Sequence, residues 1–270
     1  MTGLRSDELV AAIQRDRTRC RTQRLDILVV TVLGVVLGAT AIGISVFSDA
    51  FGADTTLSGF VELLTVNAAW LFFSLFALVG LFVAYPAHTL LRGHHGFTNP
   101  RTTFLGVLLS RIALVGTALL VAFVIPLFVG VLAFESFSLP VFFGVVALSV
   151  LAISAYTAVG VSLAAVARSD TRLVLWLLGF YWVVVFLWET SVVPLVVAFA
   201  TGADPETVIG TPPTVHDVLL AMSPGGAHAT LSETLLSGGA GVIDLVAALS
   251  LLGWLVVPPL GALVWRTRRR

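Results

Sequence analysis

The stretch PAHTLLRGHHGFTNPRTTFLGVLLSR, residues 86–111, decides how the whole chain is interpreted. It places three histidines and three arginines between two long apolar runs. About 20 consecutive apolar residues cross the hydrocarbon core of a bilayer as a helix, whereas charged side chains are strongly disfavoured there. The stretch is therefore predicted to connect two membrane-spanning helices outside the hydrocarbon core.

The composition of the chain supports a membrane protein. Hydrophobic residues make up 58% of the 270 positions and charged residues only 11%, against about 25% charged residues in an average soluble domain. The single cysteine, Cys20, excludes a disulfide framework within one chain. All 15 basic residues are arginine. Without lysine the chain has no Walker A loop and cannot hydrolyse nucleotide in that way.

Six apolar runs are each long enough to cross a ~30 Å core. An all-α, polytopic transmembrane bundle is therefore expected, with a cytoplasmic amphipathic N-terminal helix over 1–24, a six-span transmembrane domain over 25–265 and a cytoplasmic tail over 266–270. The predicted spans are residues 25–47, 60–85, 106–133, 141–166, 173–198 and 244–265.

The distribution of arginine predicts the orientation. Every arginine lies in or beside the N-terminus, the second connector, the fourth connector or the C-terminus. The alternate connectors contain no arginine but several acidic residues, namely Asp49, Asp54, Glu135, Asp204, Glu206, Asp217 and Glu233. By the positive-inside rule both termini and the 86–111 stretch are expected on the cytoplasmic side of the cell membrane.

Three ionisable residues fall inside the predicted spans. Arg111 lies about one turn into the third run, so its side chain is expected to extend to the interface. Glu62 and Glu189 lie toward the outer ends of their runs. They are interpreted either as interface anchors or as parts of a gate or substrate path.

Other segments leave alternatives open. The N-terminal helix either lies in the headgroup layer or is an ordinary positive flank. The small residues of the fourth run, between Ser149 and Ala165, favour tight helix packing or a substrate-lining face. The long connector 199–243 contains two weakly helical stretches, and Pro258 with Pro259 predicts a kink in the last span.

No catalytic or metal-binding motif is found. His94, His95 and His88 have no acid between residues 86 and 111, which disfavours a metal site. The sequence Gly160-Val161-Ser162-Leu163 lacks the closing glycine of a GxSxG elbow.

Several short motifs, in their order along the chain, resemble the six-span permease subunits of ABC type-2 transporters, including the group similar to the nitrous-oxide-reductase maturation permease. The motifs are Pro100-Arg101-Thr102-Thr103-Phe104-Leu105-Gly106, Arg168-Ser169, Trp188-Glu189, Ser223-Pro224-Gly225-Gly226-Ala227 and Trp265-Arg266. The chain departs from the family where Arg92-Gly93-His94-His95-Gly96 replaces an acidic stretch and Val107 replaces a lysine.

The resemblance implies a transport subunit that is not itself an enzyme. It implies a second permease copy, as a homodimer or heterodimer, and a separate ATPase that binds ATP and Mg; no cofactor in this chain and no nucleic acid partner are expected. The implied ATPase contact is a short coupling helix beginning near Asn99, with Pro100 at its first position. Its expected residues are Arg92, His94, His95, Asn99, Pro100, Arg101 and Leu105, with Arg111, Arg168, Trp188, Glu189, Pro258 and Pro259 as gating or interface candidates.

Two other classes of function remain possible from sequence. A membrane enzyme or scaffold would need a catalytic constellation that no motif supplies. An ion-coupled secondary transporter would be expected to carry acids or broken helices near the bilayer midplane, and the acids here lie toward the edges of their runs.

Overall fold

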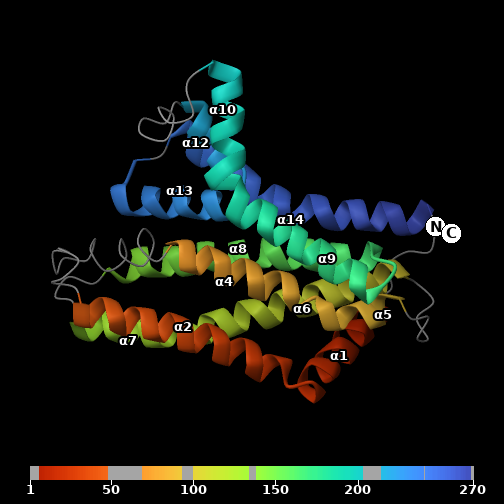
Figure 1. The fold of residues 1–270 in the computed structure, drawn as a ribbon. Coiled ribbons are helices and arrows are strands. Elements are labelled where there is room, and N and C mark those ends of the chain that lie inside the picture. Colours follow the sequence, from red (N-terminus) through yellow and green to blue (C-terminus); the bar gives the residue numbers. More distant parts are fainter. Residues whose placement is uncertain are drawn as a thin grey trace.

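The computed structural model describes residues 6–47, 69–92, 100–133, 138–202, 214–239 and 241–268, and these residues form helices with no strand among them (Figure 1). Within these described residues, six segments are long and apolar enough to cross a membrane: Leu25–Gly43, Ser74–Arg92, Pro100–Leu132, Leu139–Val166, Asp170–Ala200 and Val242–Arg268. The predicted all-α, six-span architecture is confirmed.

The described residues up to Val166 form long helices with short helices between them. Their bounds are α1 Ser6–Thr22, α2 Leu25–Phe47, α4 Ala69–Phe82, η3 Tyr85–Ala87, α5 His88–Arg92, α6 Pro100–Ala122, α7 Val124–Ala133 and α8 Leu139–Val166. The second half contains α9 Asp170–Tyr181, the π-helical segment η4 Trp182–Val192, α10 Val193–Thr201, α12 Thr214–Ala221, α13 Pro224–Ser237 and α14 Val242–Arg268.

Helix α8 lies at the centre of the bundle and packs against α4, α6, α13 and α14. Its small residues allow these helices to approach closely. A Cβ atom on Gly160 would lie only 2.6 Å from the carbonyl oxygen of Leu81, and one on Gly80 would lie 2.8 Å from the Cβ atom of Tyr156. The small-residue face of the fourth run is therefore a helix-packing surface over these positions.

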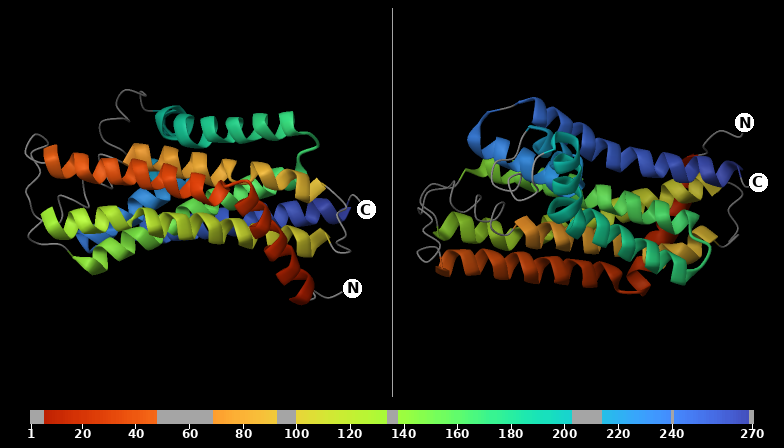
Figure 2. Two further views of the ribbon diagram at one scale, coloured as in Figure 1. Left: turned by 90° about the horizontal axis from the view of Figure 1, so that it is seen from below. Right: turned by 45° about the horizontal axis from the view of Figure 1, so that its top comes forward.

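The outside of the bundle is apolar. Large side chains such as Ile27, Val35, Phe128 and Val257 are more than half exposed. An apolar exterior of this extent is unfavourable in water but matches the hydrocarbon of a bilayer. The start of α1 and the end of α14 lie at the same end of the bundle (Figure 2).

The connector between the second and third spans is shorter than the sequence analysis expected. Residues 85–92 are helical as η3 and α5, and α6 already begins at Pro100. Pro100 is the first helical residue, as predicted, but α6 continues without interruption to Ala122 instead of forming a separate short helix. Residues 93–99, which include His94, His95 and Asn99, lie outside the described part of the chain.

The fifth span changes helix type in its middle. Pro194 has no backbone N–H, so the carbonyl of Thr190 loses its α-helical donor. The N–H of Val193 instead bonds to the carbonyl of Trp188, five residues back, in the π-helical pattern. Figure 1 shows α10, which follows, turning away from the direction of α9.

The long connector after α10 packs on the bundle. Its described helices, α12 and α13, overlap the two weakly helical stretches expected in this connector, and α13 contacts both α8 and α14. Ser223 caps α13 by accepting a hydrogen bond from the N–H of Gly226. Helix α14 continues through the buried Pro259 and the partly buried Pro258 as one assigned helix.

Candidate functional site

The end of the bundle that carries most of the described arginines is the first candidate site. We call it the Arg-rich end: Ser6–Asp16 of α1, α5, Pro100–Arg111 of α6, the loop between α8 and α9, the start of α9, and the end of α14. These elements lie together in Figures 1 and 2. Exposed side chains at this end include Arg92, Arg101, Arg168, Arg172 and Arg268. A basic surface of this kind favours a partner with acidic groups.

His88 joins α5 to the loop between the fourth and fifth spans. Its Nδ1 atom lies 2.6 Å from Asp170 Oδ1, and its Nε2 atom lies 3.2 Å from the carbonyl oxygen of Ala167. The two ring nitrogens of His88 therefore face a carboxylate oxygen and a carbonyl oxygen, and both of these oxygens accept hydrogen bonds. The side chain of His88 is 1% exposed and that of Asp170 is 61% exposed, so a buried ring meets a carboxylate that is open to solvent.

The other end of α5 is held by the last helix. Arg266 Nη2 donates to the carbonyl oxygen of Leu91, at a distance of 2.5 Å. A cationic donor suits the C-terminal carbonyls of a helix because the helix dipole is negative there. Helix α5 is thereby attached to α8, α9 and α14 at once.

A buried ion pair joins α1 to α6. Arg111 Nε donates to Asp16 Oδ2 at 2.9 Å and Arg111 Nη2 donates to Asp16 Oδ1 at 2.7 Å, a two-pronged geometry. Arg111 Nη1 donates to the carbonyl oxygen of Val83 at 3.0 Å. Both charged side chains are 0% exposed.

The expectation that Arg111 extends to the interface was wrong. Its side chain is directed into the contact between α1, α6 and the end of the second span, because Asp16 supplies a matching charge within reach. Beside the pair, α1 approaches α6 so closely that a Cβ atom on Gly106 would lie 2.5 Å from the Cβ atom of Ala12. The N-terminal helix is therefore docked on the third span through a polar contact.

The sequence analysis did not identify Asp16, Asp170 or His88 as pairing residues. A signal for Asp16 existed, because it is the only acid among the arginines of residues 15–24 and shares a helix face with Ala12 and Cys20. Burial confirms that face, since Ala12, Asp16 and Cys20 are the buried residues of α1. No comparable signal pointed to the contact of His88 with Asp170, which are 82 residues apart.

The predicted coupling residues are distributed over two helix ends. Arg92 is exposed at the end of α5, and Pro100, Arg101 and Leu105 lie in the first turns of α6. Residues Thr102, Thr103 and Phe104 between them are buried in the bundle. Arg168 is exposed between α8 and α9, on the same end as Arg92.

The opposite end of the bundle contains the candidates Trp188 and Glu189. Trp188 and Glu189 lie in the π-helical segment, and Trp188 Nε1 donates to the carbonyl oxygen of Leu219 in α12 at 3.0 Å. Glu189 is partly buried and makes no ion pair with any residue that the structure describes. The contact through Trp188 connects the fifth span to the long connector.

His228 in α13 forms a buried neutral contact at this end. Its Nε2 atom lies 2.9 Å from Ser149 Oγ in α8, and its ring meets that of Phe76 edge-on. Burial lowers the pKa of His228 from 6.5 to about 4, because the charged imidazolium is disfavoured away from water. His228 is therefore neutral at pH 7 and accepts or donates one hydrogen bond as an uncharged ring.

Within the described ranges, no cluster of three or more His, Cys, Asp or Glu side chains has the arrangement of a metal site. His88 and His228 each make a contact between helices. The arrangement at the Arg-rich end is suited to transmitting a mechanical displacement between helices through short charged contacts.

A family model described as ABC-2 family transporter protein matches residues 102–269. The match begins in the first turn of α6, includes α14 and covers more than half of the chain. No curated protein matches the chain.

Proposed function

The chain belongs to the ABC-2 transporter family and is a membrane-spanning permease subunit of an ABC transporter, and from this premise we propose that a separate ATPase drives it through the Arg-rich end. The ATPase would bind ATP and Mg, and two permease chains, identical or different, would enclose the transport path. The Arg-rich end and both termini would face the cytoplasm of the cell membrane, in keeping with the positive-inside rule.

One observation carries this proposal: the Arg-rich end is a single connected block. His88 attaches α5 to the ends of α8 and α9, and Arg266 attaches α5 to α14. Arg111 attaches α6 to α1 and to the end of the second span. A displacement of α5 by a bound motor would therefore reach all six spans.

The physical requirement is a difference in binding. The ATPase dimer must bind one arrangement of the permease more tightly than another, since a ligand with equal affinity for both shifts nothing. Helices that are joined by short charged contacts move as a unit. The free energy of ATPase binding at the surface would therefore change how the two permease chains are arranged relative to each other. Export of an amphipathic substrate is the direction and cargo class that family analogy favours.

The test removes basic charge from the proposed docking surface without touching the buried contacts. A replacement of the whole segment 92–105 by a Gly/Ser linker would also remove the buried Thr102, Thr103 and Phe104. We therefore choose the double charge reversal Arg92→Glu with Arg168→Glu, because both side chains are exposed. The ATPase is expected to be lost from the detergent-solubilised complex in a pull-down, while the melting temperature of the permease is unchanged.

The matched control reverses two charges elsewhere, in Arg19→Glu with Arg24→Glu on and after α1. These residues lie outside α5 and the α8–α9 loop, so the ATPase should remain bound. Retention of the ATPase by the Arg92 and Arg168 variant would contradict the docking surface. Loss from both variants would also contradict it, because the effect would then follow total charge.

A further inference from the structure

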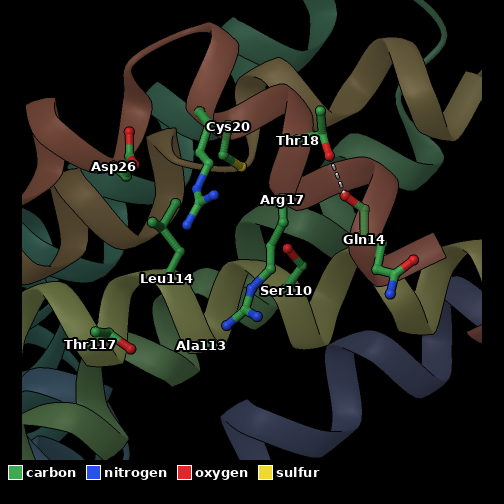
Figure 3. A pocket seen from close by; sticks show the side chains of 10 residues that line it. Gln14, Arg17, Thr18, Cys20, Asp26, Ser110, Ala113, Leu114 and Thr117 are labelled. Carbon is green, nitrogen blue, oxygen red and sulfur yellow. Dashed lines mark hydrogen bonds between the residues drawn. The ribbon is translucent and has the colours of Figure 1, made fainter. Parts of the chain in front are cut away.

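A polar cavity of about 510 Å³ lies between the second half of α1, the start of α2 and the middle of α6 (Figure 3). Its lining is separate from the contacts described above at α5. The cavity is open on one side rather than enclosed, and its walls carry both charged and neutral polar groups. Nothing in the proposed transport function uses these groups.

Two matching stripes of side chains form the walls. On α1 the stripe consists of Gln14, Arg17, Thr18 and Arg21, and on α6 it consists of Ser110, Ala113, Leu114 and Thr117. Both follow the spacing i, i+3, i+4, i+7, which places four residues on one helix face. One face of each helix therefore borders the cavity.

The α1 wall is positively charged. Arg17 and Arg21 are one turn apart and exposed, and neither has an ion-pair partner among the described residues. Figure 3 shows the guanidinium of Arg17 reaching from α1 across to α6, beside Ser110. Two guanidinium groups one turn apart are suited to holding the oxygens of a phosphate.

Two buried polar atoms in the cavity wall have no partner. Ser110 is 2% exposed, and its hydroxyl makes no hydrogen bond in the structure. Asp26 Oδ1 is likewise buried without a partner. An unpaired buried hydroxyl or carboxylate oxygen is unfavourable by about 1–3 kcal/mol, so both atoms indicate a ligand that supplies an acceptor to Ser110 and a donor to Asp26.

The position of the cavity identifies the source of such a ligand. Asp26 is the second residue of α2, where the first membrane-spanning segment begins. The first residues of a span lie at the level of the lipid head groups. The Asp16–Arg111 pair beside the cavity is internally neutralised, so the cavity itself carries Arg17, Arg21 and Asp26.

We propose that this cavity binds the head group of one phospholipid. The phosphodiester accepts hydrogen bonds from Arg17, Arg21 and the Ser110 hydroxyl. A donor further along the head group, either a glycerol hydroxyl or an ethanolamine ammonium, is held by Asp26. A choline head group, which has no such donor, fits the cavity less well.

Native mass spectrometry of the full-length protein in detergent tests this site. The protein is titrated with phosphatidylglycerol, phosphatidylethanolamine and phosphatidylcholine, and the affinity of the first bound lipid is measured. The double variant Arg17→Gln with Arg21→Gln is expected to bind the first two lipids about thirty-fold more weakly, from the effect of two arginines near anionic head groups. Asp26→Ala is expected to remove the preference over phosphatidylcholine.

The control variant is Arg19→Gln with Arg24→Gln, which removes the same charge from residues outside the cavity wall. Its affinity for the first lipid should change less than about threefold. An equal loss in the two double variants would overturn the site, since it would then reflect charge alone. Inorganic phosphate that binds the lipid-free protein and displaces phosphatidylglycerol would overturn the lipid source and indicate a soluble anion.

Discussion

The two ends of the helix bundle are held together by different kinds of hydrogen bond. At the Arg-rich end the contacts carry charge, as in Asp16 with Arg111 and Asp170 with His88. At the opposite end most hydrogen bonds between the long connector and the spans join neutral groups. They are His228 with Ser149, Trp188 with the carbonyl of Leu219, and Ser250 and Trp254 with the carbonyl of Met222. The exception is Thr234 in α13, whose hydroxyl donates to the carboxylate of Asp244 at the start of α14.

This difference predicts how each end of the bundle responds when one of its contacts is lost. A buried charge without its partner is strongly unfavourable, so the charged contacts permit few arrangements of the helices. A neutral hydrogen bond contributes about 0.5–1.5 kcal/mol and can be exchanged for another partner. We therefore expect the helices of the Arg-rich end to move together, and those of the opposite end to tolerate rearrangement.

The largest expected effect comes from removing one member of the buried ion pair. Arg111→Met leaves Asp16 charged and 0% exposed without a counter-ion, which should destabilise the fold by about 3–5 kcal/mol. Chemical denaturation or thermal melting in detergent measures the loss. Adding Asp16→Leu should restore most of the stability, because an apolar pair leaves no buried charge.

Arg19→Met is the matched control for this variant, since Arg19 lies on the same helix as Asp16 but is only partly buried. It should change stability by less than about 0.5 kcal/mol. A loss of stability in Arg19→Met equal to that in Arg111→Met would show that the buried pair has no special role.

The next effect is the pH dependence of folding stability that arises from His228, at the end opposite the Arg-rich end. Burial holds the pKa of His228 at about 4, whereas an unfolded histidine has a pKa near 6.5. Below pH ~6.5 the unfolded chain gains a proton that the folded chain does not, so stability is complete above this pH and falls as the pH drops toward about 4. The total loss is roughly 3 kcal/mol.

Melting temperatures of the wild type and of His228→Gln across this range measure the effect. The variant should have a lower melting temperature than the wild type at neutral pH, and its melting temperature should depend less on pH. His216→Gln, in the neighbouring α12, should keep the wild-type dependence. Parallel curves for the wild type and His228→Gln would exclude His228 as the source.

The smallest effect comes from a neutral hydrogen bond at the same end. Trp188→Phe removes the donor to the carbonyl of Leu219, which lies 3.0 Å away, and should destabilise the fold by about 1 kcal/mol. Trp182→Phe removes an indole that is 55% exposed and serves as the control, with a change below about 0.5 kcal/mol. A loss for Trp188→Phe as large as that for Arg111→Met would break the distinction between the two ends.

The sequence predicted the number of spans and the helical start at Pro100, because apolar length and proline position act locally. The predicted third span begins at residue 106, because the polar Thr102 and Thr103 favour a connector, whereas helix α6 begins six residues earlier, at Pro100. Both threonines are buried against the bundle, and burial by neighbouring helices is invisible in a single stretch of sequence. The π-helical segment was missed for a related reason, because Pro194 permits several local adjustments.

The candidate site could be predicted only in part. Arg92 and Arg168 were identified as candidate partner-contact and interface residues, and the structure places them at the same end of the bundle. The ATPase contact itself remains a prediction. Arg111 was identified as unusual, but its partner Asp16 is 95 residues away along the chain. Pairing over such a distance depends on how α1 crosses α6, which the close approach at Gly106 permits.

By itself the sequence determined that this protein is a bundle of six apolar helices with its arginines in or beside the two termini and alternate connectors. The physical reason is that transfer from water to lipid depends on the composition of each segment alone. Only the tertiary structure decided which charges meet, because the Asp16–Arg111 pair, the His88–Asp170 pair and the cavity beside α1 each require two segments that are distant in sequence. Whether a charge is neutralised, buried or available to a ligand is a property of the packed helices.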